Sequence, residues 1–182
     1  VVEILLEGLK RLEYRGYDSA GVALLKNDGT LTRIRRTGKV QELADAVAEG
    51  EALGTTGIAH TRWATHGKPN NDNAHPHSDN SGKFTMVHNG IIENYDSIKK
   101  ALIKRGHSFE SETDTEVLIH LIEDIKKIEK VNLFEAVRLA LNEVIGAYAI
   151  LVIDKENNEE IIAARKGSPL VIGVGKGEYF VA

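Results

Sequence analysis

Several segments place apolar residues three or four positions apart, which is the spacing of one buried face of an α-helix. In the first segment, Val2, Leu5 and Leu9 share such a face, and the pattern ends at about residue 14. A capping box, in which Thr113 begins a helix and Glu116 follows three positions later, marks another start. The predicted helices cover residues 1–14, 40–48, 91–105, 113–127 and 133–144.

Shorter apolar runs bounded by turn residues predict β-strands. The strongest hairpin signal is the turn at residues 27–30, which reads Asn-Asp-Gly-Thr. Hairpins outnumber helical crossovers, so the sheets should be largely antiparallel, and we expect a layered α+β fold with helices covering sheets. Between the strands, residues 62–82 form a long polar loop, and such loops are usually functional or mobile. The predicted strands cover residues 21–26, 31–37, 57–60, 84–88, 147–154, 160–165, 170–174 and 179–182.

Composition narrows the class of protein. The 182 residues suit a single domain, and a hydrophobic content of 42% is ordinary for a globular chain. With 23 Lys and Arg against 27 Asp and Glu, a net charge of −4 argues against nucleic acid or a membrane as partner. The longest apolar stretch, 144–153, is too short to span a bilayer. Because the chain has no cysteine, it carries no disulfide, no thiolate zinc site and no thiol nucleophile.

The two ends of the sequence predict a fragment. Residue 1 already lies within a helical pattern, and no Ser, Thr, Asp or Asn precedes it as a cap. No charged-then-apolar signal segment is present, and residues 178–182 read as a strand that simply stops. We therefore expect a single domain, 1–182, trimmed at both ends.

Three groups of polar residues together suit an amino-acid ligand with a reactive acyl group, and glutamine fits that description. Arg62, followed by Thr65 and His66, offers a fork for a carboxylate, although a structural ion pair would explain the arginine equally well. Asp114 offers a partner for an ammonium group, although helix capping alone would explain it.

The third group is Asn89-Gly90, which the pattern places where a strand meets a helix. The side-chain amide of Asn89 and the N–H of Gly90 suit an oxyanion hole for acyl transfer. The alternative is an ordinary Asn-Gly turn.

Histidines gather in one region, with five of the seven between His60 and His88, including His75 and His77. Their spacing matches no metal-binding motif, so we predict hydrogen bonds that order a loop, with no metal and no cofactor. The glycine-rich segment 173–177 opens no helix, which favours a hairpin turn over a phosphate site.

The chain closely resembles the glutaminase domain of the glutamine–fructose-6-phosphate aminotransferase family. The amino-acid sequences of residues 14–17 and 62–66 favour this family over its relatives, the phosphoribosylpyrophosphate amidotransferases and asparagine synthetases. The resemblance implies a cytoplasmic enzyme with a four-layer αββα N-terminal-nucleophile sandwich of two antiparallel sheets. The matching segments are 11–21, 60–67, 74–77, 88–94, 111–117 and 167–173.

The resemblance also implies how glutamine would be bound. Arg62 would hold the α-carboxylate with help from Thr65 and His66. Asp114 would hold the α-ammonium group together with the carbonyl of Gly90.

Catalytic and gating roles are implied in the same way. Asn89 and the N–H of the following glycine would form the oxyanion hole, and Arg15 would sit beside the nucleophile. Trp63 would lie near the exit for ammonia. His75 and His77 would belong to a loop that orders over the site.

The nucleophile itself would be a cysteine at the mature N-terminus, before Val1, with its own α-amino group as general base. Its thiolate would attack the glutamine carboxamide, ammonia would leave, and water would hydrolyse the thioester to glutamate. In the full-length enzyme, implied to be a homodimer, ammonia would pass to a C-terminal isomerase domain that binds fructose 6-phosphate.

We therefore expect the 182 residues alone to be inactive. Three other hypotheses remain open: a non-catalytic amino-acid-binding or interaction module, the glutaminase domain of a related amidotransferase, and a metal-binding hydrolase that uses the histidines.

Overall fold

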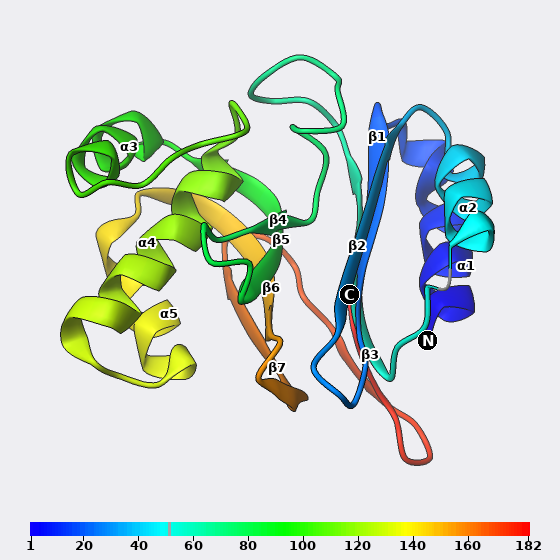
Figure 1. Cartoon of the computed structure of the whole chain (residues 1–182). Coiled ribbons are helices and arrows are strands. Elements are labelled where there is room, and N and C mark those ends of the chain that lie inside the picture. Colours follow the sequence, from blue (N-terminus) through cyan, green and yellow to red (C-terminus); the bar gives the residue numbers. More distant parts are fainter. Residues whose placement is uncertain (51) are drawn as a thin grey trace.

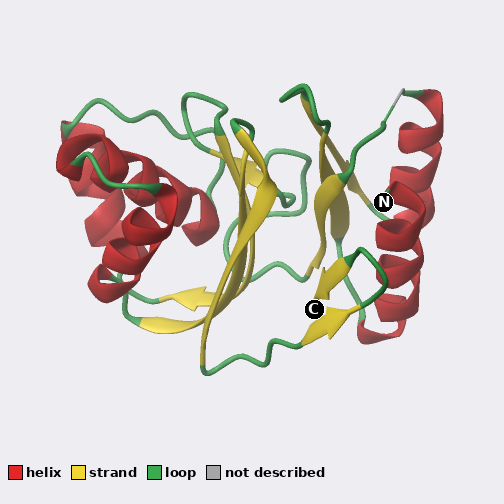
Figure 2. Ribbon diagram, turned by 90° about the horizontal axis from the view of Figure 1, so that it is seen from below, coloured by secondary structure: helices red, strands yellow, loops and turns green. Residues whose placement is uncertain are grey.

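Two antiparallel sheets lie face to face in the middle of the molecule, and helices cover both outer faces (Figures 1 and 2). This computed structural model describes residues 1–50 and 52–182. The first sheet has the strand order β2–β1–β3, and the second has the order β4–β5–β6–β7. The strands are β1 (Ser19–Leu25), β2 (Leu31–Thr37), β3 (Thr56–Arg62), β4 (His77–Ser78), β5 (Phe84–Ile92), β6 (Gly146–Asp154) and β7 (Asn157–Lys166).

The helices divide between the two outer faces (Figure 1). α1 (Val2–Leu12) and α2 (Val40–Glu49) cover the first sheet, and a short 3-10 turn, η1 (Glu13–Arg15), follows α1. The second sheet carries α3 (Tyr95–Lys104), α4 (Asp114–Glu129) and α5 (Leu133–Glu143). Among the described residues, no helix is both long and apolar enough to cross a membrane. The predicted four-layer αββα sandwich is confirmed.

Hydrophobic side chains fill the three spaces between these four layers. Leu24 and Leu43 belong to the core between the first sheet and its helices. Ile122 and Ile150 belong to the larger core between the second sheet and its helices. A smaller cluster that includes Ile58 packs the two sheets against each other. Because β1 has a core on both faces, all seven of its residues are buried, and the strand reads as a continuous apolar run.

The predicted helix over 91–105 begins too early. β5 continues to Ile92, pairs with β6 along its whole length, and α3 starts only at Tyr95. Pairing with β6 outweighs the helical spacing of the apolar residues at 91 and 92. The segment Asn89-Gly90 therefore lies inside a strand, and the prediction that it adjoins a helix N-terminus is wrong.

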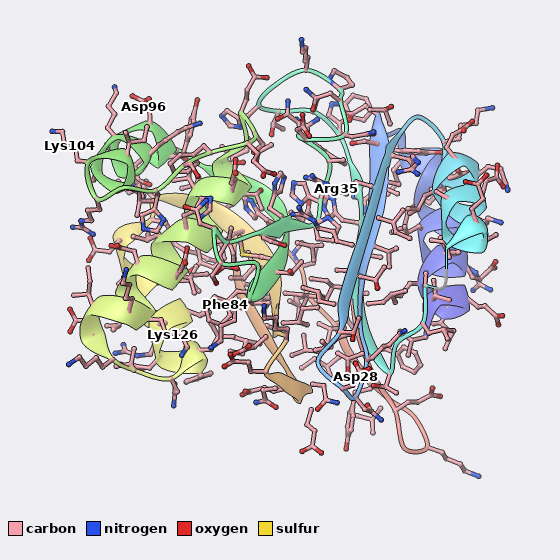
Figure 3. All side chains as sticks on the ribbon, viewed as in Figure 1. Asp28, Arg35, Phe84, Asp96, Lys104 and Lys126 are labelled. Carbon is pink, nitrogen blue, oxygen red and sulfur yellow. The ribbon has the colours of Figure 1, made fainter. Side chains whose placement is uncertain are left out.

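The long polar loop predicted over 62–82 is partly ordered by strand β4 and by side chains that reach it. Arg35 extends from β2 toward it (Figure 3), and its Nη1 donates to the carbonyl oxygens of Asp72 and Ala74 at 3.0 and 3.3 Å. Asp79 accepts hydrogen bonds from the N–H groups of Lys83 and Phe84 at 2.8 and 2.7 Å. These contacts tie the loop to both sheets.

The last two strands, β8 (Ile172–Val174) and β9 (Tyr179–Val181), form a separate antiparallel ribbon. The ribbon lies on the side of the first sheet, near the N-terminal helix (Figures 1 and 2). Its strands are shorter than the predicted 170–174 and 179–182. Val174 and Tyr179 are about three-quarters exposed on it.

Candidate active site

A cavity of about 1390 Å³ opens where α1, the ends of β3 and β5, the start of α4 and the β8–β9 ribbon meet. Its volume exceeds that of the usual small-ligand pocket, roughly 300–1,000 Å³. Val1 and Ile4 of the first helical segment line it together with Tyr179 and Phe180 of the ribbon. The lining includes nine of the ten predicted site residues, namely Arg15, Arg62, Trp63, Thr65, His66, His75, Asn89, Gly90 and Asp114.

Arg62 is the last residue of β3 and is only 4% exposed. Its Nη1 lies 3.3 Å from Oδ1 of Asp18, and its Nη2 donates to the carbonyl oxygens of His66 and Gly67, the latter at 3.1 Å. Asp18 also accepts a hydrogen bond from the N–H of Ala64. The guanidinium thus holds the turn that follows β3, and part of its donor capacity is already used by the protein.

Asp114 is the first residue of α4 and is 4% exposed. Its Oδ2 accepts a hydrogen bond from the N–H of Ile92 at 2.8 Å, which joins the helix start to the end of β5. The Nδ1 atoms of His66 and His88 lie 3.9 and 4.0 Å from its carboxylate oxygens. A buried carboxylate therefore faces the cavity beside the turn that Arg62 organises.

Thr113 caps α4 as predicted, with its Oγ1 accepting from the N–H of Glu116 at 3.2 Å. The return half of the capping box is absent here. The carboxylate of Glu116 accepts instead from the N–H groups of Glu110 and Ser111, at 2.8 and 2.7 Å, while Thr113 N–H donates to the Ser111 hydroxyl. Glu116 therefore holds the backbone of residues 110 and 111, which precede the helix, rather than the N–H of the capping residue Thr113.

Asn89 is exposed and Gly90 is half-buried in β5, opposite Ala149 and Tyr148 of β6. Gly90 has φ of 150°, and a Cβ there would lie 2.0 Å from the carbonyl oxygen of Ala147. Only glycine suits this position, because the neighbouring strand approaches so closely. The helix dipole that the sequence suggested behind Asn89-Gly90 is not available, since this pair lies mid-strand.

Three imidazoles line the cavity, of which those of His75 and His88 are buried and that of His60 is partly buried. The rings of His60 and His75 stack with centroids 4.4 Å apart, and Nδ1 of His75 accepts from the N–H of His88 at 3.3 Å. The hydroxyl of Thr115 lies 3.0 Å from Nδ1 of His88 and 3.4 Å from Nε2 of His75. Burial lowers the pKa of His60 to about 3 and that of His75 well below its ordinary value, so both rings are neutral at pH 7.

His88 differs from these two because it has a carboxylate nearby. Burial lowers its pKa, and the charge of Asp114 acts in the opposite direction. His77 lies deeper, in β4, with Nε2 3.2 Å from the hydroxyl of Thr113. Burial, followed by the charge of Arg35, lowers the pKa of His77 to about 3. His75 and His77 are 5% and 2% exposed, and such interior positions do not suit residues that close over the cavity.

Trp63, Thr65 and Arg15 form the exposed rim of the cavity. Trp63 is 68% exposed, and its ring packs against Gly16, where an added Cβ would come within 2.5 Å of Cζ3. Arg15 ends the 3-10 turn that follows α1. The cavity thus combines a buried, charged floor with an exposed aromatic and basic edge.

The sequence did not predict that Asp18, His60 and Thr115 belong to the site. Asp18 stands in the segment 11–21 that carries the family resemblance, and this was the only signal that pointed to it. His60 and Thr115 stand in the matching segments 60–67 and 111–117, and both line the cavity because β3 and α4 meet there.

Comparison with known proteins supports one family. The profile of a family described as "Glutamine amidotransferase domain" matches residues 60–182. A glutamine–fructose-6-phosphate aminotransferase [isomerizing] from Bacteroides thetaiotaomicron is 59% identical over 98% of this chain. Another, from Vibrio vulnificus, is 57% identical over the whole chain. The chain spans 29% of the length of each of these two relatives.

Solved structures agree with the sequence comparison. A glutamine phosphoribosylpyrophosphate amidotransferase from B. subtilis, complexed with ADP and GMP, superposes with a TM-score of 0.82 at 30% identity. The match covers 98% of this chain and 38% of that one. A class-II glutamine aminotransferase domain protein from silicibacter pomeroyi, at 14% identity and a TM-score of 0.59, shares the fold.

Proposed function

The chain belongs to the glutamine amidotransferase domain family, and on this premise we propose that it hydrolyses glutamine to glutamate and supplies the ammonia to a synthetic reaction. Identities of 57–59% to proteins named glutamine–fructose-6-phosphate aminotransferase extend the proposal to the full-length protein. That protein would convert fructose 6-phosphate to glucosamine 6-phosphate, and would do so as a homodimer. The sugar phosphate would bind outside these 182 residues.

One observation carries the proposal, namely that a single cavity joins groups suited to both ends of an amino acid. Arg62 supplies positive charge for the α-carboxylate, and Asp114 supplies negative charge for the α-ammonium group. Thr65 and His66 would add donors beside Arg62. For this role, Arg62 would share its donors between Asp18 and the substrate.

The reaction we propose is acyl transfer. A thiolate adds to the carboxamide carbon of glutamine, and the resulting oxyanion accepts hydrogen bonds from the Asn89 amide and the Gly90 N–H. The C–N bond then breaks, the leaving amine takes up a proton, and a thioester remains that water cleaves to glutamate. We propose that Arg15 lies beside the thiolate and Trp63 beside the path of ammonia.

The thiol would come from an N-terminal cysteine that precedes Val1. Its expected place agrees with the cavity, because Val1 is itself part of the lining. Since residues 1–182 contain no cysteine, we expect this chain alone to release no ammonia from glutamine. Measurable glutamine turnover by the purified 182-residue chain would contradict the thiol assignment.

The proposal is tested in the full-length protein by replacing Arg62 with alanine and measuring glutaminase kcat/KM. Loss of a charge-assisted contact costs about 1.5–3 kcal/mol, so we expect a drop of at least about 10-fold. Arg36→Ala is the matched control, because Arg36 is exposed on β2 and lies outside the cavity lining. Unchanged kcat/KM in Arg62→Ala would rule out the carboxylate role, and full-length protein that binds glutamine without turnover would favour a non-catalytic module.

A further inference from the structure

A second group of chemically active side chains lies outside the cavity, in the middle of α4 and in the segment that precedes the helix. His107, His120 and Glu123 each place one potential ligand atom within 4.8 Å of the other two. In the part of the chain that the structure describes, this is the only histidine–carboxylate group with such spacing. It includes none of the five histidines between His60 and His88, where the sequence drew attention to a metal.

The two imidazoles converge on one oxygen atom. Nδ1 of His107 and Nδ1 of His120 each lie 3.7 Å from Oε2 of Glu123. Two ligands of a tetrahedral zinc ion, at about 2.0–2.1 Å from the metal, lie about 3.3–3.4 Å apart. A contraction of about 0.4 Å along each of these two edges would therefore bring the oxygen to the spacing that it has from each nitrogen around a zinc ion.

Both converging nitrogen atoms lack any other partner. Nδ1 of His107 and Nδ1 of His120 are buried and accept or donate no hydrogen bond among the described residues. The His120 side chain is 1% exposed. An unsatisfied buried polar atom costs free energy, and two of them aimed at the same carboxylate oxygen are placed to bind a cation together with it.

The opposite nitrogens face carboxylates, which is the usual outer arrangement of a metal-bound histidine. Nε2 of His107 lies 3.3 Å from Oδ1 of Asp124, and Nε2 of His120 lies 3.5 Å from Oε1 of Glu116. Because each Nε2 faces a carboxylate, the Nδ1 atom of each ring is the one placed to bind a metal.

The local charge also suits a cation. Arg105 pairs with Asp124, and Arg33 and Arg35 act on Glu116 from β2. Among the described residues, no lysine or arginine pairs with Glu123, whose Oε2 otherwise accepts only the N–H of Asn80 at 3.3 Å. The carboxylate that both imidazoles face thus has no permanent cationic partner.

From this geometry we propose that His107, His120 and Glu123 bind a divalent transition-metal ion of the Zn²⁺ type. Two imidazoles and one carboxylate are ligands that Zn²⁺ prefers over Mg²⁺ or Ca²⁺, and they leave a fourth position for water. His120 and Glu123 stand at positions i and i+3 of α4, on one helix face, while His107 lies in the segment between α3 and α4. The ion would clamp that segment, which ends at Thr113 just before Asp114, to the helix.

The test uses the full-length protein with its thiols alkylated, so that cysteine cannot bind the probe, which is Zn²⁺ alone. The variants are His107→Gln and Glu123→Gln, both at partly exposed side chains, and the control is Glu129→Gln. Glu129 is exposed on the same helix, and its replacement removes the same charge. Bound Zn²⁺ is counted after dialysis by elemental analysis, and affinity is measured by titration calorimetry.

We expect wild type and Glu129→Gln each to bind one equivalent of Zn²⁺. In His107→Gln and Glu123→Gln the affinity for this ion should fall at least about 100-fold. A fall of this size is larger than the loss typical of a residue that only supports a metal ligand. X-ray absorption of the wild-type complex should show two imidazole ligands, a result that does not depend on how the variants fold. Equal binding by all four proteins, equal weakening in Glu129→Gln, or a spectrum without imidazole scattering would overturn the proposal.

Discussion

Gly90 is the residue at which the geometry of the site depends most on the absence of a side chain. Its φ of 150° and the 2.0 Å separation between an added Cβ and the Ala147 carbonyl oxygen leave no room for alanine. We expect Gly90→Ala to lower the free energy of unfolding by at least about 2 kcal/mol, because the backbone strain adds to a clash with the next strand. Urea unfolding of the 182-residue chain measures this loss.

Gly82→Ala separates the two causes. Gly82 also has positive φ, at 63°, but no atom of the described residues lies within 4 Å of a Cβ there. Gly82→Ala should lower the free energy of unfolding by only about 1 kcal/mol, from backbone strain alone. Equal losses in the two variants would show that the contact with Ala147 does not matter.

The buried histidines make stability depend on pH. Because burial lowers the pKa of His60 and His77 to about 3, against 6.5 in an unfolded chain, the unfolded state binds protons first on acidification. Their contribution to stability is complete above pH 6.5 and is lost as the pH falls toward 3, with a slope of up to about 1.4 kcal/mol per pH unit for each ring. Urea unfolding at pH 7 and pH 5 should show this loss before most carboxylates titrate.

His77→Gln provides the control for the pH effect. The variant removes one buried titrating ring, so its unfolding free energy should change less between pH 7 and pH 5 than that of the unmodified chain. The prediction would be contradicted if the midpoint of urea unfolding were the same at pH 7 and pH 5. It would also be contradicted if His77→Gln showed the same change in unfolding free energy as the unmodified chain.

At the scale of single residues, the sequence predicts chemistry better than contacts. The types and order of Arg62, Asp114 and Asn89 were sufficient to suggest glutamine. The ion pair between Arg62 and Asp18, which are 44 positions apart, depends on the pairing of β1 with β3 and has no local signal. The convergence of His107 with His120 and Glu123 was missed because it depends on how the segment before α4 packs against that helix.

Among the elements, α4 connects stability to the site most directly. Thr113 caps the helix that begins with Asp114, and removal of such a cap costs about 1 kcal/mol. We expect Thr113→Ala to lose this amount and also to raise the KM for glutamine in the full-length protein, because Asp114 loses its fixed position. Urea unfolding and steady-state glutaminase kinetics measure the two effects.

Asn132→Ala is a matched control for Thr113→Ala. Asn132 caps α5 in the same way, accepting from the N–H of Glu135 at 2.8 Å, and it does not line the cavity. It should lose similar stability with no change in KM. If both variants raise KM equally, the effect comes from general loosening and not from the position of Asp114.

Elements with clear end signals were predicted closely, and those whose ends depend on a partner were not. The helix capped by Thr113 and the hairpin at 27–30 both match their local signals. β5, in contrast, runs four residues beyond its predicted end at His88, since its length is set by pairing with β6. That extension moves Asn89-Gly90 away from a helix terminus, so the oxyanion hole we propose relies on the amide and the N–H alone.

The whole molecule places the two halves of the site on different sheets. Arg62 ends β3 in one sheet, while Asn89 and Gly90 belong to β5 in the other. The resemblance to a known family predicted this four-layer arrangement. Hydrophobic periodicity by itself predicted only layers of helix and sheet, because it does not indicate which strands pair.

The small hydrophobic cluster between the sheets should therefore control the geometry of glutamine binding. Ile58 is 1% exposed in this cluster and stands four residues before Arg62 in β3. We expect Ile58→Ala to cost about 2–5 kcal/mol of stability and to raise the KM for glutamine about 10-fold, since small displacements of binding groups are costly. Leu102→Ala, an equally buried change in the core between the second sheet and its helices, lies on α3, which carries no site residue, and should cost similar stability without this rise in KM. Equal KM values in the two variants would show that sheet separation does not determine the site.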